Sequence, residues 1–215
     1  MAQPRLLGVG IGWVVFWAIV LGFSVLFVSE TLEYTLLAES DPSADPLTSR
    51  QALVYTHAAM AIPILFLAPL QFHPGFRTRF PKVHRWTGRL FLTASILAAC
   101  LALYLALEYK PTASRPALFV FGLLWIFFAS AAWFSAMRRD FLAHRAFMIR
   151  AVAVGFAFVW VRMMRVTQDY VLPFIEDAEM RLVAREYLCF IIPLLAVEIW
   201  LTYWPALKKV VKRKG

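Results

Sequence analysis

Cysteine is scarce in this chain. Only two of its 215 residues are cysteines, Cys100 and Cys189, and both lie inside apolar stretches. No CxxC or paired Cys/His spacing is present, which excludes a disulfide framework and the common zinc sites. The absence of a CxxCH sequence also excludes a covalently attached c-type haem. We expect both thiols to be buried as small hydrophobic groups.

Acidic residues are also few. The chain has 13 Asp and Glu against 22 Lys and Arg, which gives a formal net charge of +9. In a soluble protein this excess would suggest binding to nucleic acid. Here the basic residues form short clusters between apolar runs, a pattern typical of loops that face an anionic membrane surface. The sequence therefore predicts the lipid bilayer as a partner and no nucleic acid.

Hydrophobic residues are abundant, at 61% of the chain, with a mean hydropathy of +0.68. Soluble domains average about 45–50% apolar residues, so the excess must be covered by lipid. Nineteen Phe and eight Trp also argue against disorder, because disordered chains are poor in aromatic residues. The composition predicts an all-α integral membrane protein.

Six segments are long enough to span a membrane, which requires about 20 apolar residues in a helix. They are Leu6–Val28, Ala52–Phe72, Gly88–Tyr109, Pro116–Met137, Ala146–Val166 and Tyr187–Ala206. The first is longer than the roughly 7–15 residues of a signal-peptide core, and no small-residue cleavage site follows it. We therefore predict a retained first helix and a bundle of six transmembrane helices in a single domain, residues 1–215.

The connections between these segments alternate in charge. The connections after the second and fourth segments and the tail after the sixth are basic, whereas those after the first and fifth are acidic. Basic connections remain on the cytoplasmic side of the membrane. The pattern predicts that both termini face the cytoplasm, most simply across a bacterial inner membrane.

Two histidines indicate a candidate site near the cytoplasmic face. His84 and His144 open the third and fifth segments, which run in the same direction, so the two imidazoles are expected at similar depth. Such a pair can hold a b-type haem from both sides, and Gly88, one turn after His84, would leave room for a flat ring. A quinone is the alternative occupant, and no other cofactor is predicted. The arginines that would hold or orient its polar groups are Arg85, Arg89, Arg145 and Arg150.

Other ionisable groups inside the spans keep alternative roles, and ionisable residues there usually face the bundle interior. His57 shares a helical face with Gln71 and suits a hydrogen-bonding or substrate-facing group, while His73 could compete with His84 as a ligand. Arg162 and Arg165 suit either ion pairs with acidic residues such as Asp169 or binding of an anionic group.

Glu198 lies near the middle of the sixth span. It suits either an arginine partner or a protonated relay group. A histidine beside arginine at a helix start also suits the lipid headgroups, so haem ligation by His84 and His144 remains one of two interpretations.

A resemblance to known families rests on several of these residues. Its pieces are His57, Gln71, the run from Pro81 to Leu90, Trp125, the run from His144 to Arg150, and Arg162. Together they resemble the bacterial membrane proteins of domain-of-unknown-function family 2306, although Phe147 stands where those proteins often have Trp. The first half of the pattern also resembles the core of b-561-type cytochromes, and that resemblance implies His84, with His57, as haem ligands. The fourth segment has no histidine, so two complete ligand pairs are not available.

The leading functional hypothesis is a redox-type membrane protein that binds one b-type haem, or a quinone, for electron transfer. One alternative is a non-catalytic accessory subunit of a larger membrane complex, redox or photosynthetic. Another is a small-molecule transporter that uses the Pro63 and Pro69 kinks with His57, Arg162 and Glu198. Whether the chain catalyses a reaction is left open by the sequence, and no catalytic residue is assigned.

Overall fold

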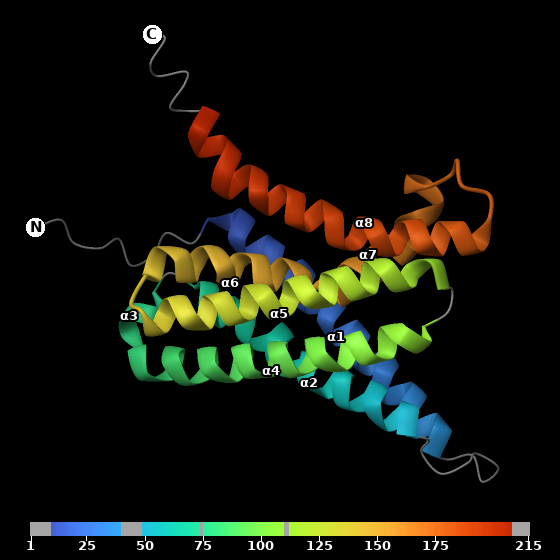
Figure 1. Cartoon of the computed structure of the whole chain (residues 1–215), viewed down its shortest axis with the longest axis horizontal. Coiled ribbons are helices and arrows are strands. Elements are labelled where there is room, and N and C mark those ends of the chain that lie inside the picture. The colour runs from blue at the N-terminus through green and yellow to red at the C-terminus, as the bar shows by residue number, and fades with distance from the viewer. Residues whose placement is uncertain (1–9, 40–48, 74, 110–111, 208–215) are drawn as a thin grey trace, which may run out of the picture. The chain divides into compact units, whose positions relative to one another are not determined.

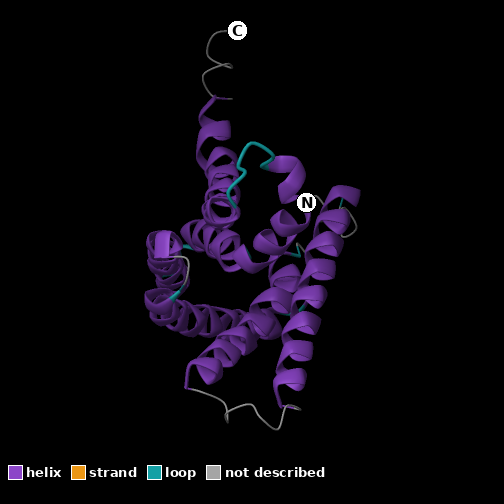
Figure 2. Cartoon of the chain, turned by 90° about the vertical axis from the view of Figure 1, so that its right-hand side faces the viewer, coloured by secondary structure: helices purple, strands orange, loops and turns teal. Residues whose placement is uncertain are grey.

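The computed structural model describes residues 10–39, 49–73, 75–109 and 112–207, and within these ranges it contains helices and no strand (Figure 1, Figure 2). The elements are α1 (Ile11–Glu39), α2 (Ser49–Phe72), α3 (Phe76–Arg79), α4 (Pro81–Glu108), η1 (Thr112–Ser114), α5 (Arg115–Met137), α6 (Phe141–Gly155), α7 (Ala157–Val171), α8 (Ala178–Glu198) and the π-helix η2 (Ile199–Tyr203). The predicted all-α class is confirmed for the described residues.

The chain forms two compact units, Met1–Ala94 and Ser95–Gly215, and the boundary between them falls inside α4. The first unit therefore contains α1 to α3 with the first half of α4, and the second contains the rest. Each unit is described by itself below. The prediction of a single domain stays a prediction.

In the first unit, aromatic side chains join α1 to the end of α2. Trp17 is buried, and its ring stacks on that of Phe72 with 6.4 Å between ring centroids. Trp13 meets His73 edge to face at 5.4 Å. Such aromatic pairs stabilise a contact by about 0.5–1.5 kcal/mol beyond the area that they bury. These contacts hold α1 against the end of α2 where α3 begins.

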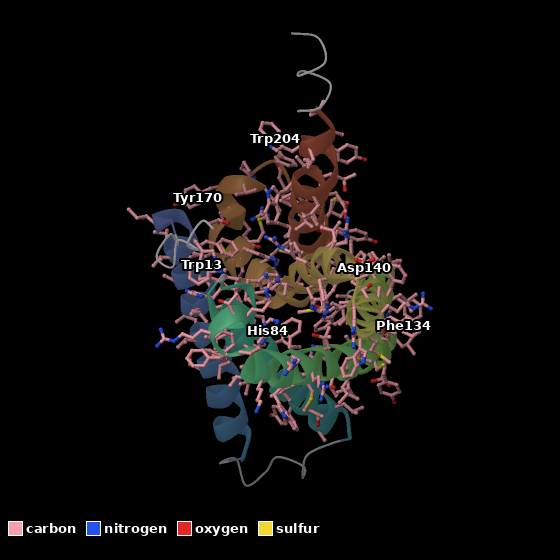
Figure 3. The ribbon with its side chains drawn as sticks, turned by 90° about the vertical axis from the view of Figure 1, so that its left-hand side faces the viewer. Trp13, His84, Phe134, Asp140, Tyr170 and Trp204 are labelled. Atoms are coloured by element: carbon pink, nitrogen blue, oxygen red, sulfur yellow. The ribbon has the colours of Figure 1, made fainter. Side chains whose placement is uncertain are left out.

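In the second unit, α5 and α6 form an antiparallel helical hairpin, whose turn end carries Phe134 and Asp140 (Figure 1, Figure 3). The turn includes Arg139 in the left-handed conformation, with φ of 60°. Asp140 then caps α6, because its carboxylate accepts a hydrogen bond from the backbone N–H of Ala143 at 3.0 Å. A side-chain cap of this kind stabilises a helix start by about 1 kcal/mol. The hairpin places His144 in the first turn of α6.

Four described helical segments are long and apolar enough to cross a membrane: Ile11–Ser29, Ala52–Phe72, Pro81–Glu108 and Thr112–Met137. The helix pair Phe141–Gly155 and Val159–Val171 makes a fifth if it is one broken span. The prediction of several transmembrane helices is confirmed, and the second span has the predicted bounds. The count of six and the orientation stay predictions.

The predicted fifth helix, Ala146–Val166, is not continuous. Its residues belong to α6 and α7, and the two parts of this pair are bent by 50°. The break falls beside Gly155, where a Cβ would meet the ring of Trp125 at 2.9–3.1 Å. Glycine weakens a helix and permits close packing, so a bend at this position has an identifiable cause.

Two predicted helix starts are later than the observed ones. The third helix begins at Pro81 instead of Gly88, with proline in the first turn where its missing N–H costs nothing. The sixth begins at Ala178 instead of Tyr187, because Asp177 caps it by accepting a hydrogen bond from the N–H of Met180. In both helices the first turn carries charged residues, so it is not part of the apolar run that predicts the span.

The cysteine prediction is half right. Cys189 is buried on α8, whereas Cys100 is exposed on α4. In a membrane helix an exposed thiol on an apolar face contacts lipid instead of a neighbouring helix, so apolar sequence context alone does not distinguish the two environments.

Candidate functional site

The ring of His144 is held in one orientation by a hydrogen bond from its Nδ1. This nitrogen lies 2.8 Å from the carbonyl oxygen of Ala132, on the neighbouring helix of the hairpin. A carbonyl oxygen only accepts, so Nδ1 carries the proton. The lone pair of the neutral ring is then on Nε2, and a backbone carbonyl bound to Nδ1–H is the usual support for a metal-binding imidazole. His144 therefore fits the ligand role that the sequence predicts.

His84 lies on the face of α4 that packs towards α2. Its ring is partly buried and meets Phe76 edge to face, with 6.5 Å between centroids. Thr87 and Gly88 share this face, and both contact Gln71 of α2. His84 belongs to the first unit and His144 to the second. The pairing of the two imidazoles therefore stays a prediction.

The space beside Gly88 has an occupant other than the predicted macrocycle. A Cβ on Gly88 would lie 3.2 Å from Oε1 of Gln71, whose amide nitrogen donates a hydrogen bond to the hydroxyl of Thr87. The hydroxyl in turn donates to the carbonyl of Val83 at 2.8 Å. Glycine at this position thus allows close approach of the Gln71 side chain. The structure gives Gly88 a helix-packing role.

Arg85 and Arg89, which are close to His84 in the sequence, lie on different faces of α4 from His84. At about 100° per residue, Arg85 and Arg89 lie roughly 100° and 140° around α4 from His84. Both are exposed, as is Arg145 in the first turns of α6. The prediction that these three side chains orient a cofactor stays a prediction.

The other two histidines have different surroundings. Nδ1 of His73 accepts a hydrogen bond from the backbone N–H of Gly75 at 3.1 Å, so the proton of the neutral ring lies on Nε2. That tautomer offers no free Nε2 lone pair, which disfavours His73 as a competing ligand. His57 is only 6% exposed, consistent with an inward-facing group on α2.

Arg150 and Glu198 form a two-pronged ion pair between α6 and α8. Arg150 Nε donates to Oε1 of Glu198 at 2.5 Å, and Nη2 donates to Oε2 at 2.8 Å. The remaining Arg150 nitrogen donates to the carbonyl of Ala146, and the hydroxyl of Thr202 donates to Glu198. Paired forks of this kind are among the strongest polar contacts in proteins. Of the two roles open to Glu198, the arginine partner is the one observed, and this guanidinium is already engaged.

Asp169, an expected partner for Arg162 or Arg165, binds a different arginine. Arg181 of α8 donates to its carboxylate at 2.9 Å. Arg165 is exposed on α7, and Arg162 is partly buried. The choice between ion pairing and anion binding for these two residues stays open as a prediction.

A second polar cluster, which was not predicted from the sequence, lies in the first half of α8. Glu186 is 5% exposed, and the hydroxyl of Tyr109 donates to its Oε1 at 2.6 Å. Burial and this carboxylate raise the pKa of Tyr109, just beyond the end of α4, so the phenol remains the donor. Arg185 donates to the side-chain oxygen of Gln168 at 2.9 Å. The signal that could have revealed the cluster is Asp177, whose capping side chain marks an earlier helix start.

The described residues define a helical protein with several helices long and apolar enough to cross a membrane, and ion pairs join α6 to α8 and α7 to α8. A family model described as a predicted membrane protein (DUF2306) matches residues 54–201. The match covers more than half of the chain, so the chain belongs to this family, and the resemblance to family 2306 is confirmed. The resemblance to b-561-type cytochromes stays a prediction. Comparisons with curated proteins and with solved structures give no match.

Proposed function

We propose that this protein is a redox-type membrane protein that binds one b-type haem, or a quinone in its place, near the cytoplasmic face of a bacterial inner membrane. The observation that carries the proposal is the hydrogen bond from Nδ1 of His144 to the carbonyl of Ala132. It fixes the ring and leaves Nε2 able to bind iron or to accept a hydrogen bond from a quinol.

The haem, when bound, supplies one-electron transfer. The protein's part would be to orient the imidazole that holds the haem, and the Ala132 carbonyl fixes the ring of His144. A hydrogen bond to the second ring nitrogen also makes Nε2 a stronger ligand. His84 would be the second ligand, an assignment that rests on the sequence pattern. Arg145 remains a candidate for the propionates, whereas Arg85 and Arg89 lie on a different face of α4 from His84. Arg150 is left with its partner Glu198.

An absorption spectrum tests this proposal. Detergent-purified protein, made with ample haem, is expected to show a sharp α-band after dithionite reduction. The variants His144→Ala and His84→Ala should each lose that band, because a six-coordinate haem needs both axial ligands. His73→Ala is the matched control and should keep it, since Nδ1 of His73 already accepts the Gly75 N–H. A flat spectrum in the parent protein contradicts haem binding and leaves the quinone as the occupant, and a band that survives both substitutions contradicts His84 and His144 as ligands.

We also propose that α8, with η2, is a sixth span, which gives the topology with both termini in the cytoplasm. The contacts of four charged side chains of α8 argue for this. Arg181 binds Asp169, Arg185 binds Gln168, Glu186 binds Tyr109 and Glu198 binds Arg150. Charged residues in a membrane helix are tolerated when they are paired inside the protein. Each of these partners lies outside α8, and two of them are opposite charges while the other two are neutral hydrogen-bonding groups.

Reporter fusions distinguish five spans from six. Green fluorescent protein joined after Gly215 should fluoresce in the cytoplasm, whereas alkaline phosphatase joined after Pro173 should be active on the outer side. The two fusion points bracket α8, so the reporters must indicate opposite sides if α8 crosses the membrane. Reporters that indicate the same side would show that α8 lies along the surface.

A further inference from the structure

One face of α4 carries basic and aromatic side chains that the proposed function does not use. We call Lys82, Arg85, Trp86 and Arg89 the basic stripe. Their spacing of three, four and seven residues places them within about 100° of arc on the helix. All four are exposed, and Trp86 is 73% exposed. The stripe is therefore a continuous surface of three positive charges around one indole ring.

The opposite face of α4 shows that the stripe points outward. His84, Thr87 and Gly88 face α2, where Gln71 contacts the last two, and Phe91 on the same side is fully buried. The stripe residues begin about 100° or more around the helix from the middle of this face. They are thus turned away from the packed interior of the first unit and available to a partner.

The length of α4 places the stripe at the level of lipid headgroups. The helix has 28 residues, or about 42 Å at 1.5 Å per residue. The hydrocarbon core of a bilayer is about 30 Å thick, so roughly 12 Å of helix must extend beyond it. The first nine residues, Pro81–Arg89, are the charged end and account for about that length. Tryptophan is enriched at this level of membrane proteins.

The local charge is uncompensated within the described residues. Residues 76–89 include five basic side chains and no acidic one, and none of the five forms an ion pair in the part of the chain that the structure describes. The five are Arg77, Arg79, Lys82, Arg85 and Arg89. Arginine binds phosphate oxygens in a two-pronged geometry, and lysine binds them as a point charge.

From this charge, exposure and depth we infer that the basic stripe binds the phosphate headgroup of an anionic phospholipid, with Trp86 packed at the boundary between headgroup and acyl chain. The inference does not depend on haem binding, because His84 lies on the other face of the same helix. It assigns to Arg85 and Arg89 a lipid contact on the outside of the protein.

Native mass spectrometry of delipidated protein tests the site. The probes are phosphatidylglycerol and phosphatidylcholine, which have similar acyl chains and different net charge. Phosphatidylglycerol should bind the parent protein more tightly, and K82Q/R85Q/R89Q should weaken it by roughly fivefold for each charge removed. Phosphatidylcholine binding should be the same for both proteins. The charge-preserving variant K82R/R85K/R89K should retain most of the affinity, which separates loss of charge from loss of fold.

Two further measurements show whether lipid binding is confined to the basic stripe and whether the bound group must be a lipid. R138Q/R139Q removes two exposed arginines from the α5–α6 turn and should leave phosphatidylglycerol binding unchanged. An equal loss in that variant would indicate diffuse attraction and overturn the inference. Inorganic phosphate should not displace the lipid, and displacement would reassign the stripe to a soluble anion. Equal affinity of the parent and K82Q/R85Q/R89Q would also refute the site.

Discussion

Replacing Arg150 with Ala is expected to destabilise the folded protein by about 3 kcal/mol, because it leaves Glu198 without the guanidinium that binds both of its oxygens. Glu198→Ala should lower the free energy of unfolding by a similar amount, because it leaves Arg150 without its carboxylate partner. The side chains are 16% and 32% exposed, and lipid cannot replace the lost partner as water would. The measurement is the midpoint of unfolding in mixed micelles with increasing dodecyl sulfate.

The double variant R150M/E198L separates pairing from charge burial. Apolar replacements of similar size remove both charges together, and such replacements are often neutral or stabilising. The double variant should therefore be more stable than either single alanine variant. Arg165→Ala is the matched control, since it removes an exposed arginine from α7 and should change stability by less than about 0.5 kcal/mol. Single variants no less stable than Arg165→Ala would show that the pair contributes nothing.

Gly155→Ala is expected to cost about 2 kcal/mol, a typical value for overpacking a filled interior. The added Cβ would lie 2.9–3.1 Å from three ring atoms of Trp125, which is only 4% exposed and cannot move aside without disturbing the α5–α6 hairpin. Gly155→Val should cost more, because its branched side chain adds bulk at the same contact. Thermal melting, with the remaining folded protein measured by size-exclusion chromatography, would give the loss of stability of both variants.

Two controls belong to the glycine prediction. Gly22→Ala should be neutral or slightly stabilising, because no atom lies within 4 Å of the added methyl and alanine favours a helix. Trp125→Phe in the Gly155→Ala background should recover part of the loss, since the smaller ring relieves the clash. If Gly155→Ala and Gly22→Ala behave alike, the close packing at Trp125 does not determine stability.

The apolar spans could be predicted from the sequence because lipid imposes a simple length and composition on a helix. The second span, Ala52–Phe72, was predicted with its observed bounds. The third and sixth helices were predicted to start seven and nine residues too late. Their first turns carry charged residues, which suit the headgroup level of a membrane but interrupt an apolar run. The cap at Asp177 was visible in the sequence as a local signal.

The candidate site was predicted less completely, because partners depend on tertiary packing. An arginine partner for Glu198 was one of two alternatives, but no sequence pattern selects Arg150, 48 residues away. Gly88 was interpreted as space for a cofactor, whereas the side chain of Gln71 fills it. The basic stripe could have been predicted from the helical period, because Arg85 and Arg89 cannot share a face of the helix with His84.

Four charged side chains of α8 each bind a partner on another element. This arrangement has a consequence for the order in which the helices assemble. Each Asp, Arg or Lys at the centre of an isolated helix costs about 2.5–3.5 kcal/mol on entering the bilayer through the translocon. If α8, the proposed sixth span, entered the bilayer alone, none of its four charged side chains would have a partner. These are Arg181, Arg185, Glu186 and Glu198. The helix can enter at low cost only when α6, α7 and Tyr109 are already in place. Membrane insertion of α8 should therefore follow that of α6 and α7, which recruit it.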